Sequence, residues 1–292
     1  MMNAQQWFDK GRLVEVNGKN LFVVDTDPHS NKPVMVILHG YPTCSFDYYK
    51  ALDYLSQDFR VIVHDHLGFG YSDKPKDYSY SLLEQAKFAL NLWQQLGVNH
   101  AHILAHDYGT SVATEILARD NENNIGSLNI DSVTLCNGSI HIEFAQLRTI
   151  QILLLNRFTG PIVALLSNKN TLKRNLKNIY FDQTAIDQPE INALWAMMTF
   201  NKGKSVLHKT TQYIKQRYTY WDRWIGALKE TELPINIVWA KNDPVAVLKI
   251  AETIHEETKN SELTLLENLG HFPMLEDPEK WAQAVIKGIS SR

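Results

Sequence analysis

The sequence predicts an α/β protein in which a mostly parallel sheet is flanked by helices and interrupted by an inserted helical cap. Short apolar runs alternate with helical patterns over residues 1–138 and again over residues 231–292. The stretch between them, residues 139–230, has apolar residues at helical spacing and lacks strand-like alternation of any length. Alternating strands and helices are typical of parallel sheets. We therefore expect residues 1–138 and 231–292 to form the core and residues 139–230 to form the cap.

The first predicted strands form a β-hairpin near the N-terminus. The run LVEV is followed by Asn17-Gly18 and then by LFVV, and Asn-Gly between two such runs is a strong hairpin signal. Four further runs are short and apolar, as are strands covered on both faces of a parallel sheet. These predicted strands are Val34–Leu38, Arg60–His64, Ala101–Ala105 and Asp131–Leu135.

Helices are predicted between these strands from the spacing of apolar residues. Residues 81–96 repeat apolar side chains at intervals of three and four, open with Ser81 and Glu84 as a capping box, and end before Gly97. A second helix is expected from Gly109 to about Arg119. After the cap we expect a strand at Ile235–Ala240, a helix near Val245–Thr258, a strand at Glu262–Leu266 and a last helix opened by Asp277-Pro278.

The composition argues against several classes of protein. The net charge is −3, the pI is about 6.4 and no long basic run occurs, so a nucleic-acid partner is not expected. Two cysteines, Cys44 and Cys136, cannot make a disulfide framework and suit a reducing compartment. The N-terminus lacks a signal-peptide pattern, and Arg157 and Pro161 interrupt the most apolar stretch. We expect a cytoplasmic monomer or homodimer with no membrane span.

The strongest local motif is Ala105-His106-Asp107-Tyr108-Gly109, at the junction of a predicted strand and helix. Small residues flank a nucleophile on such a sharp strand-to-helix turn because large side chains do not fit beside it. The motif predicts Asp107 as the nucleophile. The N–H of Tyr108, at the start of the helix, could then stabilise a developing oxyanion. An aspartate that merely caps the helix is the alternative for the motif taken alone.

Three further positions favour the catalytic interpretation. Tyr41 follows His39-Gly40 after a strand, where a loop would supply the second oxyanion N–H. Asp243 follows the strand Ile235–Ala240, where an orienting acid belongs, and His271 follows the last strand, where the base belongs. The chain order of nucleophile, acid and histidine is the one that this arrangement requires.

The remaining histidines favour structural roles. The motif His64-Asp65-His66 resembles part of a metal site, but no further ligand group accompanies it in the sequence. Strand alternation also points the two histidines to one side and Asp65 to the other. His106, beside the proposed nucleophile, is expected to be a packed, hydrogen-bonded core residue. We therefore expect neither a metal nor a cofactor.

A carboxylate nucleophile implies hydrolysis in two steps. An aspartate side chain, with an ordinary pKa of ~4, is ionised at neutral pH and can attack an sp³ carbon directly, forming an alkyl-enzyme ester. His271, held by Asp243, would then activate water to attack the carbonyl carbon of Asp107. An epoxide oxygen leaving as alkoxide calls for an acidic O–H donor, whereas a halide calls for N–H donors.

Several segments resemble the epoxide hydrolase and haloalkane dehalogenase branch of the α/β-hydrolases. They are LHGYPTCSFDYYK, HDHLGFGYSDKP, AHDYGTSVA and LGHFPMLEDP. Together with YIKQRYTYWDRWIGAL in the cap, they are most similar to the mesoderm-specific transcript-like proteins. The resemblance covers nearly the whole chain and implies the α/β-hydrolase fold and hydrolysis of a small hydrophobic substrate.

The resemblance also bears on the leaving group. Dehalogenases of the usual kind carry Trp after the nucleophile and often Asn after His-Gly, where this chain has Tyr108 and Tyr41. We therefore favour an epoxide hydrolase; a haloalkane dehalogenase-like enzyme and a catalytically silent binding protein are the alternatives. The candidate phenol donors of the cap are Tyr213, preferred because it lies in the recognisable cap segment, and Tyr180, Tyr218 and Tyr220.

Overall fold

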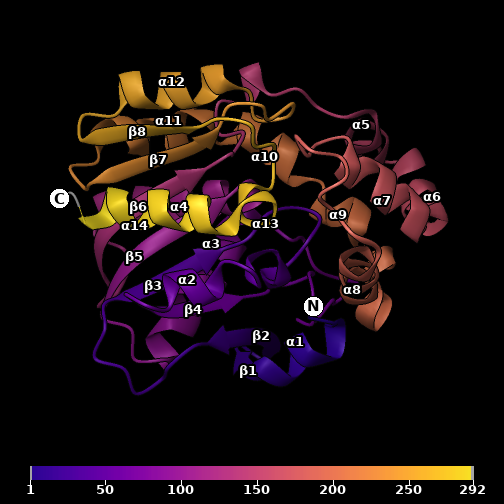
Figure 1. Ribbon diagram of the computed structural model, residues 1–292, viewed down its shortest axis with the longest axis horizontal. Coiled ribbons are helices and arrows are strands. Elements are labelled where there is room, and N and C mark those ends of the chain that lie inside the picture. The colour runs from indigo at the N-terminus through magenta and orange to yellow at the C-terminus, as the bar shows by residue number, and fades with distance from the viewer. Residues whose placement is uncertain (1, 291–292) are drawn as a thin grey trace.

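A computed structural model describes residues 2–290 and confirms the α/β class. One eight-stranded sheet has the order β1-β2-β4-β3-β5-β6-β7-β8, and it is parallel from β4 to β8 with an antiparallel hairpin at one edge (Figure 1). The strands are β1 Arg12–Val16, β2 Lys19–Asp25, β3 Val34–Leu38, β4 Arg60–His64, β5 His100–His106, β6 Asn129–Cys136, β7 Ile235–Ala240 and β8 Ser261–Leu266.

The N-terminal hairpin is confirmed, and a short helix that was not expected precedes it. Asn17 and Gly18 both have positive φ, as the tight turn requires. Helix α1 (Ala4–Lys10) is capped by Asn3, which exchanges two hydrogen bonds with Gln6 in a capping box. Trp7 anchors the helix to the core, because it is fully buried and its indole N–H donates to Ser45 Oγ.

Helix α3 (Leu82–Gln95) forms where the spacing predicted it, but its cap differs. The Ser81 side chain accepts a hydrogen bond from the N–H of Leu83. Glu84 does not complete a capping box, because its carboxylate accepts a hydrogen bond from the Tyr78 hydroxyl at 2.9 Å. Helix α4 (Tyr108–Asn121) begins one residue before the predicted start.

Two helical layers cover the sheet, and each buries one set of alternating strand side chains. On β3, Val36 and Leu38 join one cluster, whereas Met35 and Ile37 join the other. The first layer contains α3, α4, α11 (Trp221–Glu230) and α12 (Leu248–Glu257). The second contains α1, α2 (Leu52–Leu55), α13 (Pro273–Glu276) and α14 (Pro278–Ser290).

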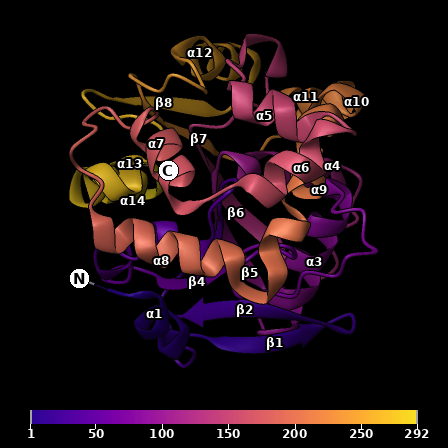
Figure 2. The same cartoon turned by 90° about the vertical axis from the view of Figure 1, so that its right-hand side faces the viewer.

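The connection between β6 and β7 is helical. Its helices are α5 Thr149–Leu155, α6 Thr159–Leu166, α7 Lys169–Lys177, α8 Gln188–Thr199, α9 Leu207–Thr210, α10 Tyr213–Thr219 and α11. Helices α5 to α9 gather at one end of the sheet (Figures 1 and 2). We propose residues 139–230 as the cap, with α11 as its attachment to the core. Glu115 on α4 accepts hydrogen bonds from Arg223 and from the Trp224 indole on α11.

Within residues 2–290, no helix is both long enough and apolar enough to cross a bilayer.

Candidate active site

Asp107 lies on a sharp turn between β5 and α4, and its backbone φ is +43°, a left-handed value that is unusual for a residue other than glycine. The side chain is 4% exposed. Gly109 makes the close packing of this turn possible, because a Cβ at this position would lie 2.1 Å from the carbonyl oxygen of Leu38. The small residue of the motif is therefore explained by the approach of α4 to β3.

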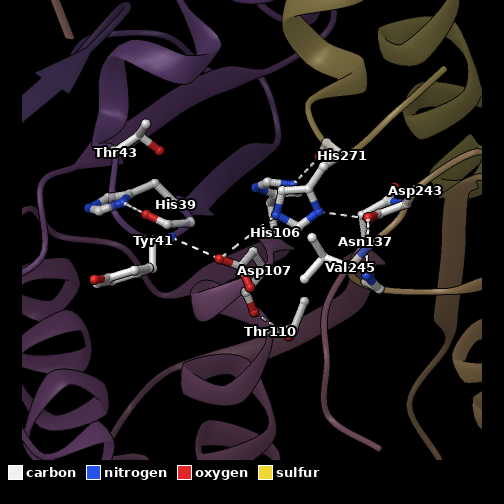
Figure 3. A network of polar contacts seen from close by, with 12 residues as sticks. His39, Tyr41, Thr43, His106, Asp107, Thr110, Asn137, Asp243, Val245 and His271 are labelled. Carbon is white, nitrogen blue, oxygen red and sulfur yellow. Dashed lines mark hydrogen bonds and ion pairs between the residues drawn. The ribbon is translucent and has the colours of Figure 1, made fainter. Parts of the chain in front are cut away.

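The loop after β3 contacts the Asp107 carboxylate directly. The backbone N–H of Tyr41 donates to Asp107 Oδ2 at 3.0 Å (Figure 3). Gly40 permits this approach, since a Cβ there would lie 2.8 Å from His106 Nδ1. Tyr108 is the first residue of α4, where backbone N–H groups have no partner within the helix. Tyr41 and Tyr108 thus flank Asp107 from two elements.

His271 and Asp243 meet beside Asp107. Nδ1 of His271 lies 2.7 Å from Asp243 Oδ2, and Nε2 lies 4.0 Å from Asp107 Oδ2 (Figure 3). Asp243 follows β7 and His271 follows β8, so the ends of three parallel strands bring these side chains together. All three side chains are buried. The arrangement holds the His271 imidazole beside the Asp107 carboxylate, where the imidazole can accept or release a proton.

The Asp243 carboxylate is fixed by its own hydrogen bonds. Asn137, at the end of β6, donates from Nδ2 to Asp243 Oδ2 at 2.9 Å. The backbone N–H groups of Val245 and Ala246 donate to Asp243 Oδ1 at 2.7 and 3.0 Å. Because both oxygens have partners, the carboxylate presents one defined orientation to the histidine.

The neighbouring charges raise the pKa of His271. Burial by itself would lower the pKa, but the carboxylates of Asp243 and then Asp107 raise it from 6.5 to about 9. The raised pKa favours the protonated form of His271 at neutral pH. After Asp243, the carboxylates of Asp107 and Asp47 act in the same direction on this pKa.

Sequence reasoning missed Arg217, which lies against the candidate nucleophile. Its guanidinium donates to the backbone carbonyl of Asp107 at 2.9 Å and to Ser111 Oγ at 2.8 Å, and it lies 3.7 Å from Asp107 Oδ1. The same group covers the ring of Tyr213, with 4.6 Å between the guanidinium carbon and the ring centroid. Only the segment YIKQRYTYWDRWIGAL, in which Arg217 lies, marked this region in the sequence.

The four cap tyrosines differ in their surroundings. Tyr213 is buried against Tyr41 and Tyr108, and its hydroxyl accepts a hydrogen bond from Gln151. Tyr180 donates to Glu190. Tyr218 is exposed, and Tyr220 packs on Trp224. None of the four lines the cavity among the described residues.

The other histidines have structural surroundings. His106 Nε2 donates to the carbonyl oxygen of His271 at 2.7 Å, which fixes its tautomer because a carbonyl can only accept. His64 and His66 are buried side by side with their ring centroids 5.0 Å apart. Asp65 instead accepts hydrogen bonds from the N–H groups of Ser45 and Tyr71. No group of three or more potential metal ligands occurs within the described range 2–290.

A cavity of about 890 Å³, including its opening to solvent, lies between the sheet and the cap. Asp107, His271 and Tyr41 form one end of it. Most of the wall is apolar and comes from Ile150, Leu154, Val163, Leu172, Leu176, Ile179, Trp195, Met198, Leu207 and Val245. Arg148 is the one cationic side chain of the cap on this wall, in the part of the chain that the structure describes.

A parallel sheet with a candidate nucleophile on its strand-to-helix turn, and with the acid and histidine on later strand ends, defines an α/β hydrolase. The family model described as the alpha/beta hydrolase fold matches residues 33–278. The chain therefore belongs to the α/β-hydrolase fold family.

Two relatives align over nearly the whole chain. The putative hydrolase LipZ of Mycobacterium tuberculosis is 33% identical over 284 residues, which cover 97% of each chain. The mesoderm-specific transcript protein of Mus musculus is 35% identical over 292 aligned positions, covering 98% of this chain and 87% of the relative. The expected resemblance to the mesoderm-specific transcript proteins is thereby confirmed.

Solved structures with low identity share the fold. Cfl2 from Burkholderia cenocepacia has a TM-score of 0.82 at 16% identity and covers 95% of this chain and 94% of its own. The epoxide hydrolase CorEH has a TM-score of 0.77 at 19% identity, covering 96% and 98%. At these identities the likeness establishes the fold alone.

Proposed function

We propose that this α/β hydrolase is an epoxide hydrolase that works through an ester on Asp107, with His271 as the base and Asp243 as the orienting acid. The observation that carries the proposal is the position of the Asp107 carboxylate. One of its oxygens accepts the Tyr41 N–H at 3.0 Å and lies 4.0 Å from His271 Nε2, on the wall of an apolar cavity. A carboxylate in this position needs no base before it attacks.

In the first step, an Asp107 oxygen attacks an epoxide carbon and forms a C–O bond. The ring C–O bond breaks, and its electron pair goes to the ring oxygen, which takes a proton from a neighbouring acid. The charge of Asp107 disappears when the ester forms. Since that charge helps to raise the pKa of His271, alkylation lowers this pKa, so the imidazolium can release its proton to solvent and leave the neutral imidazole that the next step needs as a base.

In the second step, His271 takes a proton from water, and the water oxygen attacks the carbonyl carbon of the Asp107 ester. The N–H groups of Tyr41 and Tyr108 stabilise the tetrahedral oxyanion. The intermediate collapses, and the leaving oxygen of the diol takes the proton from His271. The carboxylic acid formed at Asp107 then returns its proton to the acid that protonated the ring oxygen, which regenerates both the Asp107 carboxylate and that acid.

We propose Tyr41 as the phenol that protonates the leaving oxygen, in place of the expected Tyr213. In the described residues, Tyr41 is the one tyrosine among the residues that line the cavity. Its hydroxyl is 2.7 Å from Thr211 Oγ1, and burial raises its pKa, so the phenol stays protonated at neutral pH. A neutral phenol can donate a hydrogen bond to the developing alkoxide.

A trapping experiment tests the ester. We expect His271→Gln to be alkylated by styrene oxide and to stall, so that mass spectrometry finds the added mass on the peptide containing Asp107. Asp107→Asn, treated identically, should carry no adduct. Adduct on another residue, or none on a folded His271→Gln protein, would contradict the proposal.

An isotope experiment separates an ester from direct attack by water. With enzyme in excess over epoxide in ¹⁸O water, the label should enter the Asp107 carboxylate and be absent from the first diol formed. Label in the diol after a single turnover would mean that water attacks the epoxide itself. Steady release of bromide from 1,2-dibromoethane without epoxide turnover would favour a dehalogenase instead.

A further inference from the structure

The outer sides of α5 and α6 expose an unusual number of apolar side chains. Of the eleven large hydrophobic side chains that are exposed in the described residues, six lie between positions 152 and 166. They are Ile152, Leu153, Phe158, Ile162, Leu165 and Leu166, and their exposed fractions run from 40% to 78%. Single exposed apolar residues are ordinary, but a group of six on two consecutive helices and the residue that caps the second, Phe158, marks an interaction surface.

The longer stretch that contains these positions, residues 144–181, carries only positively charged side chains. From position 144 to position 181 the sequence has no Asp or Glu, although the whole chain has a net charge of −3. Its six cations are Arg148, Arg157, Lys169, Lys173, Arg174 and Lys177. Within residues 2–290 none of these six forms an ion pair. The stretch therefore presents an excess of positive charge.

The apolar side chains and the cations belong to neighbouring helices at one end of the molecule. Helices α5, α6 and α7 lie together on the cap side that faces the viewer in Figure 2. On α7, the cations Lys173, Arg174 and Lys177 line a single surface depression. The nearest acid after the segment, Asp182, is occupied by hydrogen bonds from the N–H and hydroxyl of Thr184. We define the outer sides of α5, α6 and α7 as the cap face.

We propose that the cap face docks on the surface of an anionic lipid bilayer. The apolar side chains of α5 and α6 enter the headgroup boundary, and the cations of α7 contact lipid phosphates. Apolar burial combined with basic residues is the usual physical basis of peripheral membrane binding. A twofold contact of the cap face with a second copy would instead place cations opposite cations, which is unfavourable.

The inner sides of the same helices line the cavity. Leu154, Val163 and Leu172 belong to α5, α6 and α7 and form part of its wall. One helix diameter, ~10 Å, therefore separates the docked surface from the cavity. An apolar molecule dissolved in the bilayer would have a short route to the site, whatever reaction the site performs.

Vesicle flotation tests the docking surface. We expect the protein to float with vesicles of phosphatidylglycerol and phosphatidylcholine at low salt, and to float much less at high salt or with phosphatidylcholine alone. The double variant Phe158→Ser with Leu165→Ser should bind at least ~10²-fold more weakly, since each buried side chain contributes roughly tenfold. Leu13→Ser, an exposed apolar position on β1, is the matched control and should bind normally.

A second set of variants tests the charge. Replacing Lys169, Lys173 and Arg174 by Gln should weaken binding by ~10²-fold, about fivefold for each cation near an anionic surface. Replacing Lys10, Lys76 and Lys87 by Gln changes the net charge equally and should have little effect.

Three results would overturn the inference. One is equal binding to anionic and neutral vesicles, and another is binding that the cap-face variants leave unchanged. The third is light scattering that reveals a concentration-dependent dimer lost in the double variant at Phe158 and Leu165, which would assign the face to self-association. All substituted side chains except Lys173 are exposed, so circular dichroism and thermal unfolding should match the wild type and exclude misfolding.

Discussion

At the scale of single residues, the site is a balanced set of four buried ionisable groups. The carboxylates of Asp107 and Asp243 are matched by the cations of His271 and Arg217, and each side chain is at most 5% exposed. Burying charge is costly unless the charges are paired, which explains why these groups contact one another. Loss of the Asp107 charge through ester formation would leave one positive charge in excess, which favours a neutral His271.

Stability should depend on pH through His271. Its pKa is raised from 6.5 to about 9 in the folded protein. A raised folded pKa stabilises the fold below pH 6.5, and this contribution is lost as the pH rises through 9. Urea unfolding should therefore give a free energy of unfolding that falls between these pH values by more in the wild type than in His271→Gln. Asp243→Asn, which removes the carboxylate on Nδ1, should flatten the dependence; equal slopes in all three proteins would contradict the assignment.

The leaving-group donor can be identified by comparing two phenols. Tyr41→Phe should lower the rate of Asp107 alkylation by epoxides about 10²-fold, the low end for one acid group, because Tyr41 lines the cavity. Tyr213→Phe should change this rate only a few-fold, because Tyr213 is not among the residues that line the cavity and its hydroxyl accepts a hydrogen bond from Gln151. Stopped-flow single turnovers measure both rates. A greater loss in Tyr213→Phe would restore Tyr213 as the donor.

At the scale of elements, helix α8 of the cap is fixed to the core by a buried carboxylate. Glu190 is fully buried, lies 2.7 Å from Lys50 Nζ and accepts a hydrogen bond from the Tyr49 hydroxyl at 3.0 Å. Tyr180, in the cap, donates to its other oxygen. These contacts tie the cap to the loop that follows β3.

Removing this carboxylate should loosen the cap. Glu190→Ala removes the carboxylate that Lys50 and two tyrosine hydroxyls contact, and we expect it to lower the free energy of unfolding by about 3 kcal/mol. The exposed Glu230→Ala is the control and should change it by less than ~0.5 kcal/mol. Urea unfolding measures stability, and limited proteolysis of the segment between α7 and α8 reports local opening. Unchanged stability in Glu190→Ala would show that the ion pair does not secure the cap.

At the scale of the whole molecule, sheet and cap enclose a cavity that is reactive at one end and mostly apolar along its wall. Each added CH₂ that enters such a cavity gains ~0.8 kcal/mol, or roughly fourfold. We therefore expect kcat/KM to rise by about that factor per carbon from 1,2-epoxybutane towards 1,2-epoxyoctane. A doubly charged epoxide such as epoxysuccinate should be turned over poorly. A flat chain-length series would indicate that the apolar wall does not bind the substrate.

The sequence by itself determined the strands and the order of the candidate triad. Buried strands of a parallel sheet are short apolar runs, and Asp107, Asp243 and His271 stand directly after such runs. Because parallel strands end at one edge of the sheet, their proximity follows from local patterns. The helix cap at Ser81 was predicted only in part, since the partner of Glu84 is a tyrosine outside the helix.

Tertiary structure alone decided which side chains of the cap approach Asp107. Helical spacing shows that Tyr213 and Arg217 lie on one side of α10, but it does not show which of them contacts the core. Packing placed the guanidinium of Arg217 against Asp107 and the Tyr213 hydroxyl against Gln151. The physical reason is that the orientation of a cap helix depends on contacts between residues more than 100 positions apart, and no local pattern in the chain records those contacts.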